Sequence, residues 1–174
     1  ALLLGKNPLW SPATVKSAMM TTATSVLNQD GSRNGDVFAT GAGQVAVASA
    51  VSPGLVYDAT ADDYLKFVQG TGLDLGIPGL GSTAARDMNL ASFAVGSLAG
   101  KVTVTRTLTA LTPGIYRAVA SVPGIKVTVT PSILNFSSAG EKRTFKVTFE
   151  NSSAKLGEFS TGSLSWQGAN KNVA

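Results

Sequence analysis

The sequence predicts an α+β protein in which a mainly helical first part is followed by an all-β sandwich. The hydrophobic pattern changes from a period of 3.6 residues to a period of 2 after the middle of the chain. Between the two parts, residues 70–87 carry five glycines and Pro78, which is too many for a regular element. Charge divides at the same place, because five basic and seven acidic residues stand up to Asp87, against nine and three after it. We therefore expect a first part over 1–69, a glycine-rich linker over 70–87 and a sandwich over 88–174.

The segment SPATVKSAMMTTA predicts the first well-defined helix. Ser11 is a good N-cap, and Pro12 suits the first helical position because the N–H that it lacks would be unpaired there anyway. We expect this helix to span about residues 12–23, with one apolar face. That face would hold Val15, Ala18 and Met19.

A capping-box pattern predicts a second, short helix near the end of the first part. Thr60 is followed three residues later by Asp63, just before the apolar residues of YLKFV. Between the two helices, PGLVYD predicts a turn at Pro53 and Gly54 followed by a brief extended segment.

The second part alternates apolar and polar residues as a half-buried sheet does. KVTVTRTLTAL and TFKVTFE show this alternation, and IYRAVASV, IKVTVT, ILNF and GSLSW lie between turn residues. The spacing predicts about seven strands in a small antiparallel β-sandwich. Leu164 and Trp166 share one strand face, so we expect the indole to lie in the sandwich core. The inward positions of the longer strands are Val102, Val104, Leu108, Phe145, Val147 and Phe149.

Composition excludes most kinds of chemistry. The chain has no His and no Cys, which removes the commonest general base, any thiolate nucleophile and any disulfide. No apolar run reaches the roughly 18 to 20 residues that span a bilayer, and the initial ALLL lacks the length and flanks of a signal peptide. We therefore expect no catalytic, cofactor-binding or metal-binding residue in this chain, no cofactor and no membrane partner.

Two patterns could carry ligand chemistry but have simpler interpretations. GAGQVA, residues 41–46, fits the dinucleotide fingerprint, and Asp58 or Asp62 lies where an acid could bind a ribose. No strong strand precedes Gly41, so a tight turn that needs glycine is favoured. Asp62 and Asp63 are adjacent carboxylates, but neighbouring helical residues do not share a face, so helix capping is favoured over acid–base or metal chemistry.

Two further features of the second part could mark a site for a partner or a modification: its positive charge and two Asn-X-Ser motifs. Lys142, Arg143 and Lys146 could attract polyanions, but they lie along strands, so a solvated sheet face is favoured and no nucleic-acid partner is expected. Asn135 and Asn151 match the glycan acceptor pattern. We expect Asn135 to point outward, since its neighbours take the inward positions, and Asn151 to lie in a turn after a strand.

Seven segments follow one another along nearly the whole chain: WSPATVKSAMMTTA, GAGQV, SPGLVYD, DDYLKF, KVTVTRT, GEKRTFKVTF and GSLSW. In this order they resemble the C-terminal part of subtilisin-like serine proteases (peptidase S8 family) that carry a fibronectin type III-like domain. The resemblance implies that residues 1–69 end an α/β protease domain, with the rest of that domain as their partner. It also implies a secreted parent enzyme that cleaves protein or peptide substrates.

The same resemblance places no member of the catalytic triad in this chain. The nucleophilic Ser of a GTSMA-like motif would lie just before Ala1, and the catalytic Asp and His and the oxyanion-hole Asn further upstream. Our first hypothesis is therefore the C-terminal fragment of a secreted subtilisin-like endopeptidase, inactive by itself. The alternative is a free-standing extracellular β-sandwich binding module. The apolar ALLL start favours the first, because a free module should not begin with an unburied apolar segment.

Overall fold

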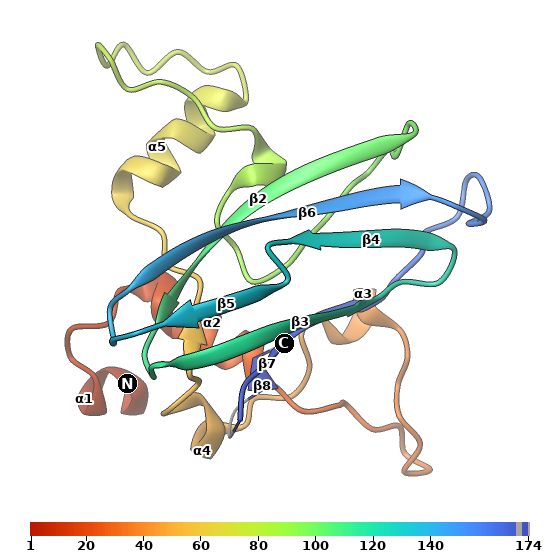
Figure 1. Ribbon diagram of the computed structural model, residues 1–174, viewed down its shortest axis with the longest axis horizontal. Helices are drawn as coiled ribbons and strands as arrows, with labels where there is room; N and C mark the ends of the chain where they lie inside the picture. Colours follow the sequence, from red (N-terminus) through yellow and green to blue (C-terminus); the bar gives the residue numbers. More distant parts are fainter. Residues whose placement is uncertain (170–171, 174) are drawn as a thin grey trace.

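The computed structural model describes residues 1–169 and 172–173, and its largest feature is a β-sandwich (Figure 1). Two antiparallel four-stranded sheets form it, in the strand orders β1-β2-β6-β4 and β5-β3-β7-β8. The strands are β1 (Leu55–Val56), β2 (Lys101–Ala110), β3 (Gly114–Ser121), β4 (Ile125–Thr130), β5 (Ile133–Phe136), β6 (Lys142–Asn151), β7 (Ser163–Gln167) and β8 (Asn172–Val173).

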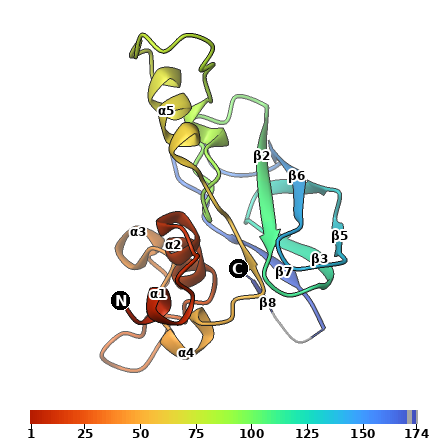
Figure 2. The ribbon, with the colours of Figure 1, turned by 90° about the vertical axis from the view of Figure 1, so that its left-hand side faces the viewer.

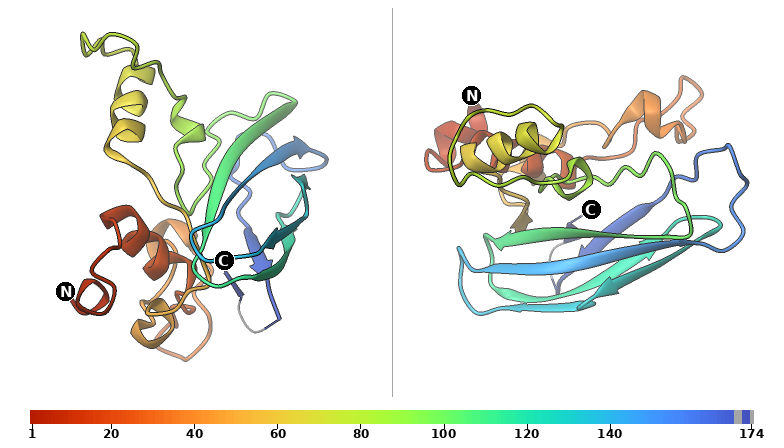
Figure 3. Two further views of the ribbon diagram at one scale, coloured as in Figure 1. Left: turned by 60° about the vertical axis from the view of Figure 1, so that its left-hand side comes forward. Right: turned by 90° about the horizontal axis from the view of Figure 1, so that it is seen from above.

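The helices lie beside the sandwich, on the side of β2 (Figures 2 and 3). They are α1 (Leu2–Lys6), α2 (Pro12–Thr21), α3 (Val37–Thr40), α4 (Val47–Ala50), α5 (Ala61–Gly70) and the single 3₁₀ turn η1 (Ala85–Asp87). We call residues 1–52 the helical segment. Together, the helices and the two sheets confirm a mostly β, sandwich-based fold with a few helices.

The predicted strands are confirmed, and one more strand joins them. The described residues of 88–174 contribute seven strands, in agreement with the number that the spacing predicted: the six named runs are β2 to β7, and β8 is the seventh. The extended piece predicted in PGLVYD is β1, and it pairs antiparallel with β2, with Leu55 opposite Ala110 and Val56 opposite Thr109. A strand from the first part of the chain thus extends a sheet of the sandwich. That residues 70–87 are a linker between two separately folding parts of the chain stays a prediction.

Helix α2 begins where the sequence predicts, but its buried face differs from the predicted one. The Ser11 side chain caps the helix by accepting a hydrogen bond from the Thr14 N–H. Of the predicted apolar face, Val15 and Met19 are only half-buried. The buried residues are Thr14, Ser17, Ala18 and Thr21. The predicted face is therefore confirmed at Ala18 and wrong at Val15 and Met19, because α2 lies against the main chain of Tyr57, where small side chains fit.

Helix α5 has the predicted capping box and projects away from the sandwich (Figure 1). The Thr60 hydroxyl accepts from the Asp63 N–H, while the Asp63 carboxylate accepts from the Thr60 N–H at 2.8 Å. None of its residues is buried. At its end, a Cβ on Gly70 would stand 2.1 Å from the Thr83 carbonyl oxygen, so the returning loop passes too close for any residue but glycine.

The sandwich core draws residues from both sheets and from the first part of the chain. The rings of Phe145 and Trp166 meet edge to face with centroids 4.9 Å apart, and Tyr57 lies 6.4 Å from Phe145. Trp166 is fully buried, as predicted. The core cluster consists of Leu55, Tyr57, Leu108, Ala110, Tyr116, Leu134, Phe136, Phe145, Val147, Trp166 and Val173.

Candidate functional site at the junction of the helical segment and the sandwich

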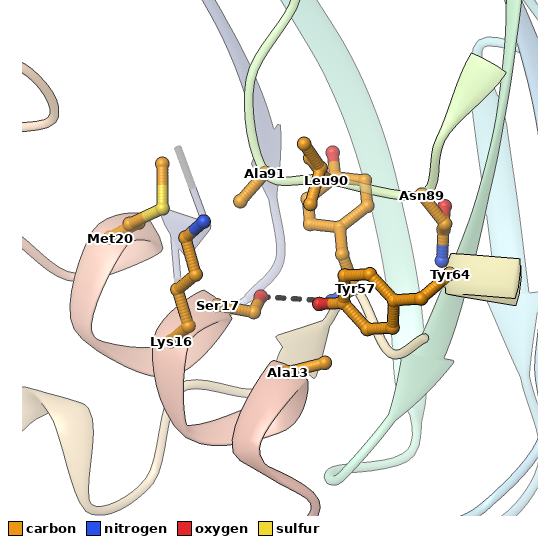
Figure 4. Close-up of a pocket in the computed structure, with 9 residues that line it drawn as sticks. All are labelled: Ala13, Lys16, Ser17, Met20, Tyr57, Tyr64, Asn89, Leu90 and Ala91. Carbon is orange, nitrogen blue, oxygen red and sulfur yellow. Dashed lines mark hydrogen bonds between the residues drawn. The ribbon is translucent and has the colours of Figure 1, made fainter. Parts of the chain in front are cut away.

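Four segments meet between the helical segment and the sandwich: α2, residues 53–59, residues 85–93 and β2. Figure 4 shows a small pocket where the first three converge. The Ser17 hydroxyl accepts a hydrogen bond from the Tyr57 N–H at 2.9 Å, drawn as a dashed line in Figure 4. The Ser11 hydroxyl, which caps α2, donates to the Asp58 carboxylate. Helix α2 is therefore attached to residues 57 and 58, which directly follow β1.

Side chains from residues 85–93 pair with the exposed edge of β2. The Asn89 Oδ1 accepts from the Thr107 N–H at 2.8 Å, and its Nδ2 donates to the Thr107 carbonyl at 2.9 Å. The same Nδ2 donates to the Asp58 carbonyl at 2.8 Å. Two residues along, the Asp87 carboxylate accepts from the Thr105 N–H at 2.9 Å. Strand β1 pairs with Thr109 and Ala110 of β2, and the side chains of Asn89 and Asp87 then hydrogen-bond to the main chain of Thr107 and Thr105. The main-chain groups at this edge of β2 therefore have partners beyond the end of β1.

Arg106 fixes the main chain of the same segment. Its side chain is buried, and its guanidinium donates at 2.8 to 3.0 Å to the carbonyls of Arg86, Leu90 and Ser92, as well as to that of Thr105. The guanidinium carbon also lies 4.7 Å from the centroid of the Phe93 ring. One side chain of β2 thus binds three carbonyls of the 85–93 segment.

Burial changes the acid–base properties of the junction. It raises the pKa of the Tyr57 hydroxyl well above its ordinary value, although the positive charge of Arg106 acts in the opposite direction. Burial also lowers the pKa of the Arg106 guanidinium, and the tyrosinate form of Tyr57 and the Asp87 carboxylate oppose that shift. Tyr57 therefore stays protonated near neutral pH.

The helical segment also exposes a large number of apolar side chains to solvent. Leu9 is 97% exposed and Leu2 is 77% exposed. Phe38 packs edge to face against Phe159 of the β6–β7 loop, with ring centroids 5.2 Å apart, and both rings are largely exposed. The exposed large apolar residues of this segment are Leu2, Leu4, Leu9, Leu27, Val37, Phe38, Val45 and Val47. A surface of this kind is typical of one that another protein region covers.

The glycine pattern of residues 41–46 forms a turn between α3 and α4. Gly43 has a φ of 119°, and a Cβ there would lie 2.2 Å from the Thr24 carbonyl oxygen. The main chain of Gln44 pairs with Thr24 in an isolated bridge. No strand leads into Gly41, since α3 ends directly before it. Gly43 is needed for this close approach of two chain segments, whereas a Cβ on Gly41 would meet no atom.

The candidate acids take part in local structure, and two of them, Asp58 and Asp63, line one pocket together with Asp87. Asp63 belongs to the capping box, and the hydrogen bond from the Thr60 N–H lowers the pKa of its carboxyl. Asp62 lies exposed in the first turn of α5, and Asp58 bonds to Ser11. Within residues 1–169 and 172–173, no three His, Cys, Asp or Glu side chains gather in a way that could hold a metal ion.

The basic residues of β6 are spread over solvent. Lys142, Arg143 and Lys146 are exposed, and the Arg143 guanidinium forms an ion pair with Glu141. Asn135 lies exposed in β5, as expected. Asn151 is half-buried as the last residue of β6, one position earlier than the turn in which we expected it. In the described part of the chain, no helix is long and apolar enough to cross a bilayer.

Arg106 and Asn89 were not identified from the sequence as residues of the junction. Arg106 follows Val102 and Val104 at a spacing of two, so its position on the inward face of β2 was readable from the alternation. Asn89 carries no such signal, because it lies in an irregular segment after η1 and its partners are distant in sequence.

Residues 87–174 match the family model described as "Fibronectin type-III domain". Over 95% of its length, the chain is 36% identical to Subtilisin-like protease SBT1.7 of Arabidopsis thaliana, covering 25% of that protein. It is 37% identical to Subtilisin-like protease SBT3.2 of the same plant, over 99% of the chain and 26% of the relative. Subtilisin-like serine-protease S of Lotus japonicus is 33% identical over 99% of the chain and 25% of its own length.

The chain thus spans about a quarter of the length of these relatives. The similarity runs through both the helical segment and the sandwich, since it covers almost every residue. These matches confirm the resemblance that the seven sequence segments indicated.

Proposed function

Because this chain belongs to the fibronectin type-III domain family through residues 87–174 and is homologous to the C-terminal region of plant subtilisin-like proteases, we propose that it serves as that region of a subtilisin-like serine endopeptidase. The helical segment and α5 complete the core of the protease domain, and the sandwich is a structural domain joined to it. The parent enzyme cleaves peptide bonds through an acyl-enzyme on an activated serine. That serine and its histidine belong to the rest of the parent, since these 174 residues contain no His.

The observation that carries this proposal is the two-sided character of the helical segment. One side is attached to the sandwich through Ser11, Ser17 and their partners after β1. The other side exposes apolar residues such as Leu2 and Leu9, which would be costly to leave in water, at about 25 cal/mol for each Å². The occupant that we propose for this surface is the rest of the protease domain, because similarity to proteases about four times as long extends across the helical segment.

The junction supports a structural role for the sandwich. Ser11 and Ser17 attach α2 to residues 57 and 58, and Asn89 in turn joins the Asp58 carbonyl to β2, so hydrogen bonds connect α2 with the sandwich. A domain connected in this way at the border of a protease domain can limit which substrates reach the active site. We further propose that the parent is secreted, and that residues 1–69, 70–87 and 88–174 are its protease end, linker and sandwich.

A domain exchange tests this function. The matching quarter of Subtilisin-like protease SBT1.7 of Arabidopsis thaliana is replaced by this chain, and the hybrid is expressed with its own leader. We expect a secreted hybrid that cleaves casein and reacts with a fluorophosphonate. A hybrid that folds and is secreted but has no activity would contradict the proposal and favour a free-standing binding module.

A pair of matched variants tests the apolar surface. Leu9 and Leu156 are exposed to a similar extent, at 97% and 92%, but Leu9 lies in the helical segment and Leu156 in the β6–β7 loop. Leu9→Asp should leave the stability of this chain unchanged and abolish secretion or activity of the hybrid, because a buried unpaired carboxylate is costly. Leu156→Asp should leave both intact. Equal behaviour of the two variants in the hybrid would argue against the proposed occupant.

A further inference from the structure

The acceptor motif Asn135-Phe136-Ser137 lies on an edge strand that presents its asparagine to solvent. Strand β5 is at the edge of its sheet, and it alternates strictly between exposed and buried side chains. Leu134 and Phe136 are 3% and 1% exposed, and they fix the register of the strand. Asn135 and Ser137 are both exposed. The two residues that a glycosyl-transferring enzyme recognises therefore lie open at one edge of the sandwich.

Two isoleucines accompany Asn135 on the outer face of this sheet. Ile115 of β3 lies directly opposite Asn135 in the antiparallel register. Ile133 precedes Asn135 by two residues and so points to the same side. Ile115 is 63% exposed and Ile133 is 43% exposed, although both belong to well-paired strands. Side chains directly opposite each other stand about 4.5 to 5.5 Å apart at Cβ, which is within reach of the first sugar of a glycan.

The second motif, Asn151-Ser152-Ser153, has a different environment. The Asn151 Nδ2 donates to the Ala154 carbonyl at 3.3 Å, and its Oδ1 accepts from the Ala154 N–H at 3.0 Å. The Ser152 hydroxyl donates to the Gly124 carbonyl at 2.9 Å. The side-chain amide of Asn151 thus closes the turn after β6, and a sugar on its nitrogen would compete with that turn.

We propose that Asn135 carries an N-linked oligosaccharide whose first sugars cover Ile115 and Ile133, and that Asn151 carries none. This rests on the proposed secretion of the parent, because the donor is a membrane-bound polyprenyl diphosphate oligosaccharide of the secretory route. In the transfer, a bond forms from the Asn135 Nδ2 to C1 of the reducing-end N-acetylglucosamine. The bond from C1 to the diphosphate oxygen breaks, the polyprenyl diphosphate leaves, and one amide proton is released to solvent. A bulky, hydrated group then covers apolar surface that is otherwise exposed on the sheet.

The acceptor site is tested in the full chain, expressed in insect cells behind a secretory leader. We expect one glycoform whose gel shift is removed by peptide-N-glycosidase, with the resulting Asn-to-Asp conversion located at residue 135 by mass spectrometry. Asn135→Gln should lose the shift, and Asn151→Gln should retain it. A chain without a glycan, a glycan at Asn151, or glycans at both positions would each overturn the proposal.

The covering role is tested by the binding of a hydrophobic dye to the secreted proteins. Asn135→Gln should bind more dye than the wild type, and the increase should disappear when Ile115→Thr and Ile133→Thr are already present. If Asn135→Gln raises dye binding by the same amount in the Ile115→Thr, Ile133→Thr background, the glycan does not cover the isoleucines. Because the leader is supplied, these results do not depend on protease activity. Failure of the protease hybrid and failure of glycosylation are therefore separate outcomes.

Discussion

The side-chain amide of Asn89 pairs with the main chain of Thr107 as a strand residue would. Its Oδ1 accepts from the Thr107 N–H at 2.8 Å, and its Nδ2 donates to the Thr107 carbonyl at 2.9 Å. One side chain thereby gives a main-chain N–H and a main-chain carbonyl of β2 their partners, and it also binds Asp58. Replacing it should leave partly buried main-chain groups unpaired.

We predict that Asn89→Ala lowers the free energy of unfolding by about 1 to 3 kcal/mol, the usual cost of leaving buried donors and acceptors unpaired. Urea denaturation followed by tryptophan fluorescence measures it. Asn135→Ala, at an exposed asparagine in unglycosylated protein, should change the free energy by less than about 0.5 kcal/mol. Equal effects of the two substitutions would show that the Asn89 pairing contributes nothing.

Arg106→Lys should release the 85–93 segment although it keeps the positive charge. Lysine has no planar fork of donors and cannot reach the carbonyls of Arg86, Leu90 and Ser92 together. We expect a loss of about 1.5 to 3 kcal/mol in stability, with faster hydrogen exchange at residues 85–93. Arg117→Lys, at an exposed position of β3, is the control. Unchanged exchange in Arg106→Lys would mean that the segment is held by other contacts.

Trp166→Ala should destabilise the sandwich more than any other substitution proposed for this chain. The indole is fully buried against Phe145, and its removal leaves a large cavity. We expect a cost of about 3 to 5 kcal/mol, seen as loss of cooperative thermal unfolding in near-ultraviolet circular dichroism. Ile115→Ala removes an exposed side chain of the neighbouring strand and should leave the melting curve almost unchanged. A Trp166→Ala protein that melts like the wild type would contradict the core position.

Limited proteolysis should cut the chain in the exposed loop between about Gly72 and Gly81, where no regular element is present. A resistant C-terminal piece is expected from the predicted division into parts. Since β1 is paired with β2 and Tyr57 lies in the sandwich core, the N-terminal piece should remain bound to it. Size-exclusion chromatography of the nicked protein checks this, and separation of the pieces in native buffer would contradict it.

The isolated chain should show no peptidase activity. No His is present to deprotonate any Ser, and the tyrosine of raised pKa in the junction cannot replace it near neutral pH. A fluorophosphonate probe should label no serine. Labelling of one specific Ser that disappears on unfolding would refute the assignment of the triad to the rest of the parent.

The sequence by itself determined strands β1 to β7, the two capped helices and the position of Trp166. These features depend on local rules. Alternation places Phe145 and Trp166 inward, Ser11 and Thr60 cap their helices through residues three positions later, and glycine is needed where Gly43 approaches Thr24. Each of these sequence signals lies within a few residues of the structure that it specifies. The exception is Gly43, whose close neighbour Thr24 is distant in the sequence.

Only the tertiary structure decided how the two parts of the chain are joined. The pairing of β1 with β2 and the contacts of Asn89 and Arg106 link residues 14 to 55 positions apart, and no local pattern encodes such partners. The buried face of α2 was predicted only in part, for the same reason. Apolar periodicity identified Ala18, but it could not identify Ser17, which is buried where its hydroxyl accepts a hydrogen bond from the main chain after β1. Which residues are buried therefore depends on what lies opposite them, and that is set by the folded chain as a whole.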